Sequence, residues 1–190
     1  MITDAKLLRN KQTLETVPSN PGWYRWWCKE NIAKQLLGAF AADILEKLTR
    51  GENELSEYYL MYVGIAVKES LRARLNWHVN QKHTLSCVKS GVLSTFRQSI
   101  SSLVAEDQSN EKVTNEIIDH FKVEYFPCAE EIKSDAAKTC IENKEKEEIV
   151  NHILPLNIQH NQKSEIQYFM KHLKERRKNG KIKGMARFGK

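Results

Sequence analysis

The chain has 190 residues, of which 41% are hydrophobic and 28% are charged, and its net charge is +6. This composition is typical of a soluble globular domain and excludes a chain too polar to build a core. No stretch approaches the roughly 20 apolar residues of a membrane span, and the N-terminal MITDAKLLRNKQ has charges where a secretory signal is apolar. We therefore expect a cytoplasmic protein without a membrane partner.

Hydrophobic periodicity and turn residues divide the chain into short strands and helices. The expected strands are GWYRWW (22–27), YYLMYVGIA (58–66) and KVEYF (122–126). The expected helices span residues 5–15, about 31–48, 69 to about 81, a segment capped by Ser94, a segment around 113–121, and about 132–153. Few strands among several helices predict an α+β fold with a small sheet.

The expected organisation has three parts. Residues 1–17 form an N-terminal helical extension, and residues 18–160 form the main domain, which contains a helical insertion at about 29–57. Residues 161–190 form a basic helix or tail. The segment 171–190 contains nine Lys or Arg and one Glu, so its local charge of +8 exceeds that of the whole chain. Such a tail suits a flexible arm that meets a polyanion, although a solvated tail that only maintains solubility explains the charge equally well.

Four cysteines, at positions 28, 87, 128 and 140, are scattered and form no CxxC pair. Reduced thiols are the expectation for a cytoplasmic chain. His78 and His83 lie close in sequence, but without cysteine partners they do not predict a structural zinc site.

The helix that follows Gly64 brings an arginine and a histidine close to its buried side. Leu71, Leu75 and Val79 mark that side, and Arg74 and His78 lie beside it, one helical turn apart. An arginine at such an edge can extend its head to water, so this pair alone does not identify a site.

The late helix contains a carboxylate within an apolar stripe. Ile141, Glu145, Ile149 and Ile153 recur every four residues, while Glu142, Glu147 and Glu148 are expected to face solvent. An unpaired buried carboxylate is costly, so Glu145 should lie at a cleft, pair with a cation or bind a metal ion. A stripe that begins only at Ile149 is the alternative.

Taken together, these segments resemble the GIY-YIG endonuclease family. Gly22-Trp23-Tyr24 resembles its first motif, and Tyr62-Val63-Gly64 resembles its second. Arg74 and His78 match the arginine and histidine of the next helix. EKEEIVNHILPLN supplies a glutamate, Glu145, and an asparagine, Asn157, twelve positions apart.

The sequence departs from the family pattern in two places. Trp23 replaces the isoleucine of the first motif, and Tyr24 and Tyr62 are 38 positions apart, a gap that the helical insertion explains. The resemblance covers roughly residues 18–160. It implies a small three-stranded antiparallel sheet flanked by helices, with extra helices in this chain.

The resemblance also implies a mechanism, the hydrolysis of DNA phosphodiester bonds. Tyr24 would activate water, Tyr62 would orient the water or the phosphate, and His78 would relay the proton. Arg74 would hold a phosphate oxygen, and Asn157 would support the site. Glu145 would bind one divalent cation, Mg²⁺ or Mn²⁺.

Other basic residues are candidates for nucleic-acid contacts. They are Arg97, within STFRQSISSL, and four residues of the basic tail, Lys174, Arg176, Arg177 and Lys178. A homodimer would allow symmetrical cutting of both strands. The competing hypothesis is a non-catalytic nucleic-acid-binding protein with the same fold.

Overall fold

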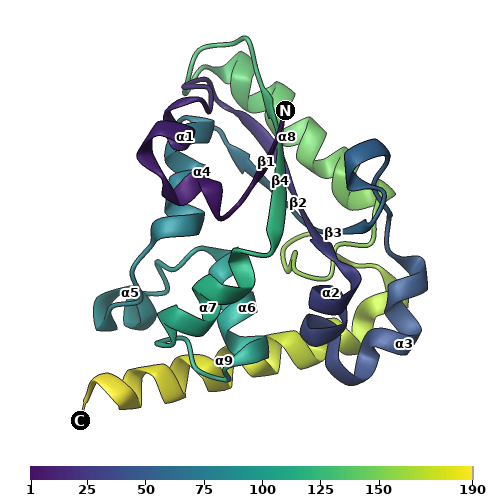
Figure 1. Cartoon of the computed structure of the whole chain (residues 1–190), viewed down its shortest axis with the longest axis vertical. Coiled ribbons are helices and arrows are strands. Elements are labelled where there is room, and N and C mark those ends of the chain that lie inside the picture. Colours follow the sequence, from purple (N-terminus) through teal and green to yellow (C-terminus); the bar gives the residue numbers. More distant parts are fainter. Residues whose placement is uncertain (190) are drawn as a thin grey trace.

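Four antiparallel strands form one sheet in the computed structural model, which describes residues 1–189 (Figure 1). They are β1 (Ile2–Asp4), β2 (Gly22–Lys29), β3 (Tyr58–Ala66) and β4 (Phe121–Pro127). Their order across the sheet is β1-β4-β2-β3, so β2 is an inner strand and β3 is an edge strand. The α+β fold is confirmed, and the three expected strands are all present.

The fourth strand corrects the expectation of a three-stranded sheet. β1 pairs with β4, with Ile2 opposite Glu124. Three residues are too few to show an alternating pattern, so β1 gave no signal in the sequence. The helix expected over residues 5–15 is divided into a 3₁₀ turn and a short α-helix, which begins after the Asn10 cap.

Helices account for most of the remaining chain. The α-helices are α1 (Lys11–Glu15), α2 (Glu30–Leu37), α3 (Ala41–Ile44), α4 (Leu71–Asn80), α5 (Leu85–Ser90), α6 (Thr95–Val104), α7 (Glu111–Ile118), α8 (Asp135–Asn151) and α9 (Gln167–Phe188). The 3₁₀ turns are η1 (Leu7–Arg9), η2 (Gly38–Phe40), η3 (Leu45–Lys47), η4 (Asn53–Leu55) and η5 (Ser164–Ile166). No helix within residues 1–189 is both long enough and apolar enough to cross a membrane.

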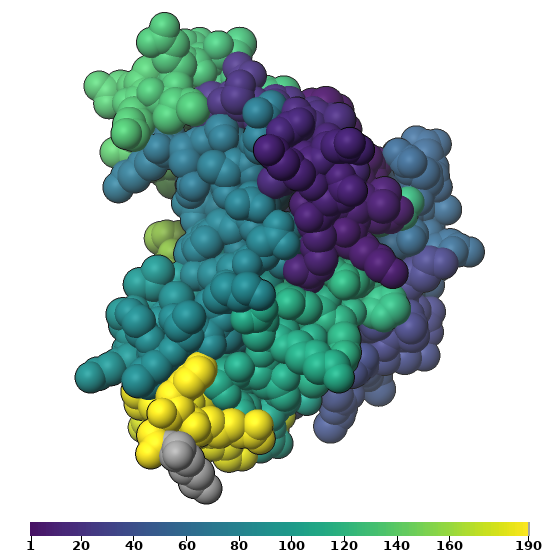
Figure 2. Space-filling model, turned by 60° about the vertical axis from the view of Figure 1, so that its left-hand side comes forward, coloured from purple at the N-terminus to yellow at the C-terminus, as the bar shows by residue number. Residues whose placement is uncertain are grey.

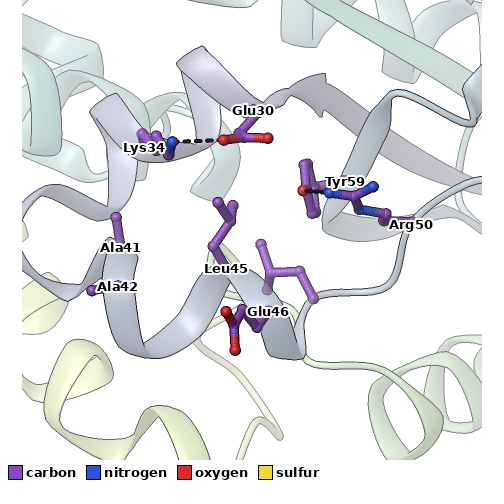
Figure 3. Close-up of a pocket in the computed structure, with 9 residues that line it drawn as sticks. Glu30, Lys34, Ala41, Ala42, Leu45, Glu46, Arg50 and Tyr59 are labelled. Atoms are coloured by element: carbon purple, nitrogen blue, oxygen red, sulfur yellow. Dashed lines mark hydrogen bonds and ion pairs between the residues drawn. The ribbon is translucent and has the colours of Figure 1, made fainter.

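The segment between β2 and β3 is less regular than its sequence predicts. The sequence predicts one helix over about 31–48, but α2 ends at Leu37, and the next residue, Gly38, has a φ of 58°, a left-handed value that favours glycine. Short helical turns then lead to β3. This segment lines a hollow between α2, α3 and Tyr59 of β3 that contains none of the predicted site residues (Figure 3).

The two faces of the sheet are covered differently. The larger core lies on the face that carries Tyr24 and Trp26, and α2, α4, α6, α7 and α9 supply apolar side chains to it. The smaller core lies on the opposite face, where Ile149 of α8 packs with Trp27 and Leu60. The sheet thus separates α8 from most of the other helices.

The basic C-terminal segment is an ordered helix and not a flexible arm. α9 packs against α6 and α5 and runs along one end of the molecule (Figure 1). Phe169 and Leu173 are buried in the larger core. Some of its cations are paired, because Arg176 and Lys183 both contact Glu106.

Candidate active site

Two neighbouring strands place both motif tyrosines on the same face of the sheet. In the β2–β3 pair, Tyr24 lies opposite Gly64, and Trp26 lies opposite Tyr62. Side chains alternate between faces along a strand, so Tyr24 and Tyr62 are diagonal neighbours. Tyr24 is 1% exposed and Tyr62 is 9% exposed, so Tyr62 lies nearer to solvent.

Gly64 makes room for this arrangement. A Cβ at Gly64 would overlap the hydroxyl group and ring of Tyr24. The ring of the first motif therefore covers the glycine of the second, and a larger residue there would displace Tyr24.

Helix α4 brings the histidine to this pair of tyrosines. Ser70 caps the helix, since its hydroxyl oxygen accepts a hydrogen bond from Ala73 N at 3.1 Å. Two turns later, His78 Nε2 and Tyr24 Oη share a hydrogen bond of 2.6 Å. Tyr24 of the first motif and His78 of α4 are therefore in direct contact.

His78 is held in its neutral form. It is 2% exposed, and burial lowers its pKa well below the ordinary value, with the charges of Arg74 and Arg97 adding to the effect. Within residues 1–189, its Nδ1 has no hydrogen-bond partner. A neutral imidazole has one nitrogen free to accept a proton, which a charged one lacks.

Arg74 lies at the surface of the same site. Its Nε is 2.8 Å from Glu69 Oε1, and its guanidinium lies 4.8 Å from the centre of the Trp77 ring. The side chain is 25% exposed, so the guanidinium is fixed in orientation yet open to a ligand.

Glu145 completes the group from α8. It is half-buried, and burial raises the pKa of its carboxyl group, opposed by His160 and reinforced by Glu142. No ion pair of Glu145 occurs in the described part of the chain. Within residues 1–189 the carboxylate is therefore a partly desolvated anion without a direct ion pair.

Burial raises the pKa of both tyrosines, and charges of the same site act on them. For Tyr24 the neighbouring Tyr62 and Glu145 reinforce the rise, and for Tyr62 the carboxylate of Glu145 does so, while Arg74 opposes the rise for both. His78 joins the two tyrosines, because it shares a hydrogen bond with Tyr24 and its ring centre lies 6.3 Å from that of Tyr62. The charges of Arg74 and Glu145 act on both phenols.

Asn157 acts on the backbone of the second motif. Its Oδ1 accepts a hydrogen bond from Val63 N at 2.9 Å, and its Nδ2 donates to Val63 O at 2.8 Å. Leu156 N also donates to Met61 O at 3.0 Å. Asn157 therefore fastens the segment after α8 to the free edge of β3.

Glu148 is buried, whereas the sequence predicts that it faces solvent. Arg25 of β2 reaches it with two hydrogen bonds, from Nε at 2.8 Å and from Nη2 at 2.6 Å, and His152 Nε2 lies 3.6 Å away. Arg25 points to the sheet face opposite Tyr24. The buried residues of α8 therefore include a carboxylate outside the predicted stripe, and this one is paired.

Arg97 does not reach the surface, contrary to its predicted role in binding nucleic acid. It is 0% exposed and donates hydrogen bonds to His83 Nε2 at 2.9 Å, to His78 O at 2.8 Å and to Asn115 Oδ1 at 2.7 Å. It joins α6 to the end of α4, close to the histidine of the site. The sequence around Arg97 does not predict its burial, because its hydrogen-bond partners come from three separate segments of the chain.

The other predicted nucleic-acid contacts differ in exposure. Lys174 and Lys178 are exposed on α9, whereas Arg176 is paired with Glu106. Arg177 is half-buried, donates a hydrogen bond to Gln98 Oε1, and lowers the pKa of Tyr62 by its charge. Arg177 thus lies near the tyrosines and not on the outer face of the helix.

The donor set suits a cation that needs few protein ligands. No group of three or more His, Cys, Asp or Glu side chains suited to a metal ion occurs within residues 1–189. Mg²⁺ keeps several waters and accepts one or two carboxylates together with substrate phosphates. The unpaired carboxylate of Glu145, with Glu142 one turn away, fits such an ion.

A hollow in the surface is lined by Arg74 of the candidate site and by Glu142. Figure 2 shows the hollow between the green segment that leads into α8 and the teal segment around α5.

His160, whose charge acts on Glu145, was not predicted, since an isolated histidine in a loop gives no signal in the sequence.

A family model, the GIY-YIG catalytic domain, matches residues 22–179. The chain belongs to this family. The match begins at β2 and continues into α9, so the GIY-YIG domain here includes most of the C-terminal helix. Comparison with curated proteins and with solved structures gives no match. The family is one of nucleases, and the chain therefore carries a nuclease domain.

Proposed function

We propose that this GIY-YIG chain is a metal-dependent endonuclease that hydrolyses DNA phosphodiester bonds. The observation that carries the proposal is the 2.6 Å hydrogen bond between Tyr24 and a neutral, buried His78, within reach of the charges of Arg74 and Glu145. A proton acceptor, an anchor for phosphate and a ligand for a cation are the three requirements of the reaction.

Tyr24 and His78 supply the proton path. The raised pKa of Tyr24 makes a free phenolate a poor resting state, and the lowered pKa of His78 keeps its imidazole neutral. Tyr24 Oη therefore accepts the proton of the attacking water while it passes its own proton to His78 Nε2. Tyr62, the more exposed phenol, orients the water or the phosphate.

Arg74 and Glu145 act on the phosphate and the cation. The partly exposed fork of Arg74 holds a non-bridging phosphate oxygen, which its planar geometry suits better than that of lysine. Glu145 would hold Mg²⁺ or Mn²⁺, which when bound would stabilise negative charge on the phosphate and the leaving oxygen. Asn157 keeps Val63, and with it the second motif, in place.

The test is cleavage of supercoiled plasmid by the purified chain with Mg²⁺ or Mn²⁺, with and without EDTA. We expect nicking that requires the cation and is lost in Glu145→Ala. Glu147→Ala is the matched control, because Glu147 lies on the same helix, is exposed and, among the described residues, forms an ion pair only with Lys144.

Two outcomes contradict the proposal. Nicking that persists in EDTA or in Glu145→Ala would overturn the role of Glu145 and its cation. An absence of nicking together with retained binding of the plasmid in a shift assay would favour a non-catalytic binding protein.

Since each chain has one candidate active site, we also propose that a homodimer cuts both strands of a duplex.

A further inference from the structure

A groove of lysines lies directly beside Arg74. Lys68, Arg74, Lys133 and Lys138 line it, and Ile65 and Val67, from the end of β3 and the turn after it, provide apolar lining. We call it the lysine groove. The loop before α8 is held against this end of β3, since Lys133 N donates a hydrogen bond to Val67 O at 3.2 Å.

The lysine groove has an excess of positive charge. Four cations line it, and two carboxylates act on them: Glu142, which also lines the groove, and Glu69, which pairs with Arg74. Lys68, Lys133 and Lys138 are exposed, and in the described part of the chain none of them forms an ion pair. On α9, by contrast, Arg176 and Lys183 both form ion pairs with Glu106.

The groove continues into the candidate active site. Arg74 belongs to both. Lys138, Glu142 and Glu145 follow one another at intervals of four and three residues on α8, so they share one face of that helix. A chain of phosphates in the groove would therefore lead along α8 from Lys138 towards Glu145.

We infer that the lysine groove binds the sugar-phosphate backbone of the DNA strand that carries the scissile phosphate, on one side of that phosphate. This rests on the proposed function and assigns the groove a place beside the reaction centre. Lysine ammonium groups bind phosphate as point charges, and the apolar residues accept the sugar faces. Contacts of this kind position a strand and do not read its sequence.

The experiment measures binding of a fluorescein-labelled DNA duplex, and of its single strand, by anisotropy in EDTA at several salt concentrations. The variant is Lys68→Gln/Lys133→Gln/Lys138→Gln. The control is Lys6→Gln/Lys47→Gln/Lys112→Gln, which removes three exposed lysines elsewhere on the molecule. All six side chains are exposed, so both variants should fold, and thermal unfolding verifies this.

We expect the groove variant to bind about 10- to 100-fold more weakly, with a slope of log K against log salt that is smaller by about 2 to 3. The control should keep the affinity and slope of the natural chain. Equal slopes for the groove variant and the natural chain would overturn the groove assignment and leave the proposed nuclease activity standing. Failure of the natural chain to bind either probe would overturn both.

Discussion

Glu145 and Glu148 lie three residues apart on α8 and have opposite surroundings. Glu148 receives two hydrogen bonds from Arg25 and lies near His152, on the sheet face away from the tyrosines. Glu145 is half-buried near Tyr24 and Tyr62 and has no ion pair in residues 1–189. The comparison separates a carboxylate that stabilises the fold from one whose charge is left available to a ligand.

The largest expected effects come from exchanging the two carboxylates for amides, one at a time. Glu148→Gln should lower the free energy of unfolding by about 2 to 3 kcal/mol, because it removes the carboxylate that accepts two hydrogen bonds from the mostly buried Arg25, which then keeps only its longer contact with Glu124. Glu145→Gln should instead reduce the rate of DNA cleavage by about 10³-fold or more, without loss of stability.

Urea unfolding and plasmid nicking measure the two effects, and Glu147→Gln is the control for both. Glu148→Gln should change the free energy of unfolding, and Glu145→Gln should change the rate of nicking. If Glu145→Gln lost stability and Glu148→Gln did not, the division between the two carboxylates would be wrong.

A smaller effect is expected at the phenol that shares a proton with His78. Tyr24→Phe removes only the hydroxyl group and should lower the cleavage rate by about 10²-fold, because the proton path to His78 Nε2 is interrupted. Tyr59→Phe is the matched control, since Tyr59 is also a buried residue of the sheet but its hydroxyl group accepts a hydrogen bond from Arg50. Equal rates for the two variants would exclude Tyr24 from proton transfer.

The strands and the order of the site residues could be predicted from the sequence, because they depend on local patterns. β2, β3 and β4 lie where their β-prone runs indicate, and Ser94 caps α6 as expected. The pairing of Tyr24 with His78 followed from the resemblance, and the structure adds that the contact is direct.

The rest depends on contacts between distant segments, which periodicity does not encode. Glu148 looks solvent-facing on α8 alone, and its partner Arg25 is 123 residues away in sequence. Arg97 looks like a surface cation, but His83 and Asn115 enclose it with hydrogen bonds. The short pairing of β1 with β4 likewise joins two segments that lie far apart in the sequence.

The smallest expected effect concerns the stability of the site itself. Burial raises the pKa of Glu145, so its native state holds the proton more tightly than its unfolded state. The native state therefore loses stability as pH rises through that pKa, and Glu145→Gln should avoid this loss.

Differential scanning calorimetry in EDTA tests this. The Tm of Glu145→Gln should exceed that of the natural chain by about 1 to 2 °C near neutral pH, and the difference should vanish at a pH well below the ordinary pKa of glutamate, where the carboxyl group is protonated in both states. Mg²⁺ should then raise the Tm of the natural chain and not that of Glu145→Gln. A lower Tm for the variant at neutral pH would show that Glu145 is favourably paired.

The hydrogen bonds from Asn157 to Val63 have a consequence for assembly. β3 would otherwise present unpaired backbone groups at one side of the sheet, and such strands recruit strands from other molecules. The amide of Asn157 and the backbone of Leu156 occupy this edge, and the strand at the opposite edge, β1, has only three residues. Two copies of this chain are thus discouraged from joining their sheets into one, and a dimer that cuts both DNA strands must form through its helices or loops.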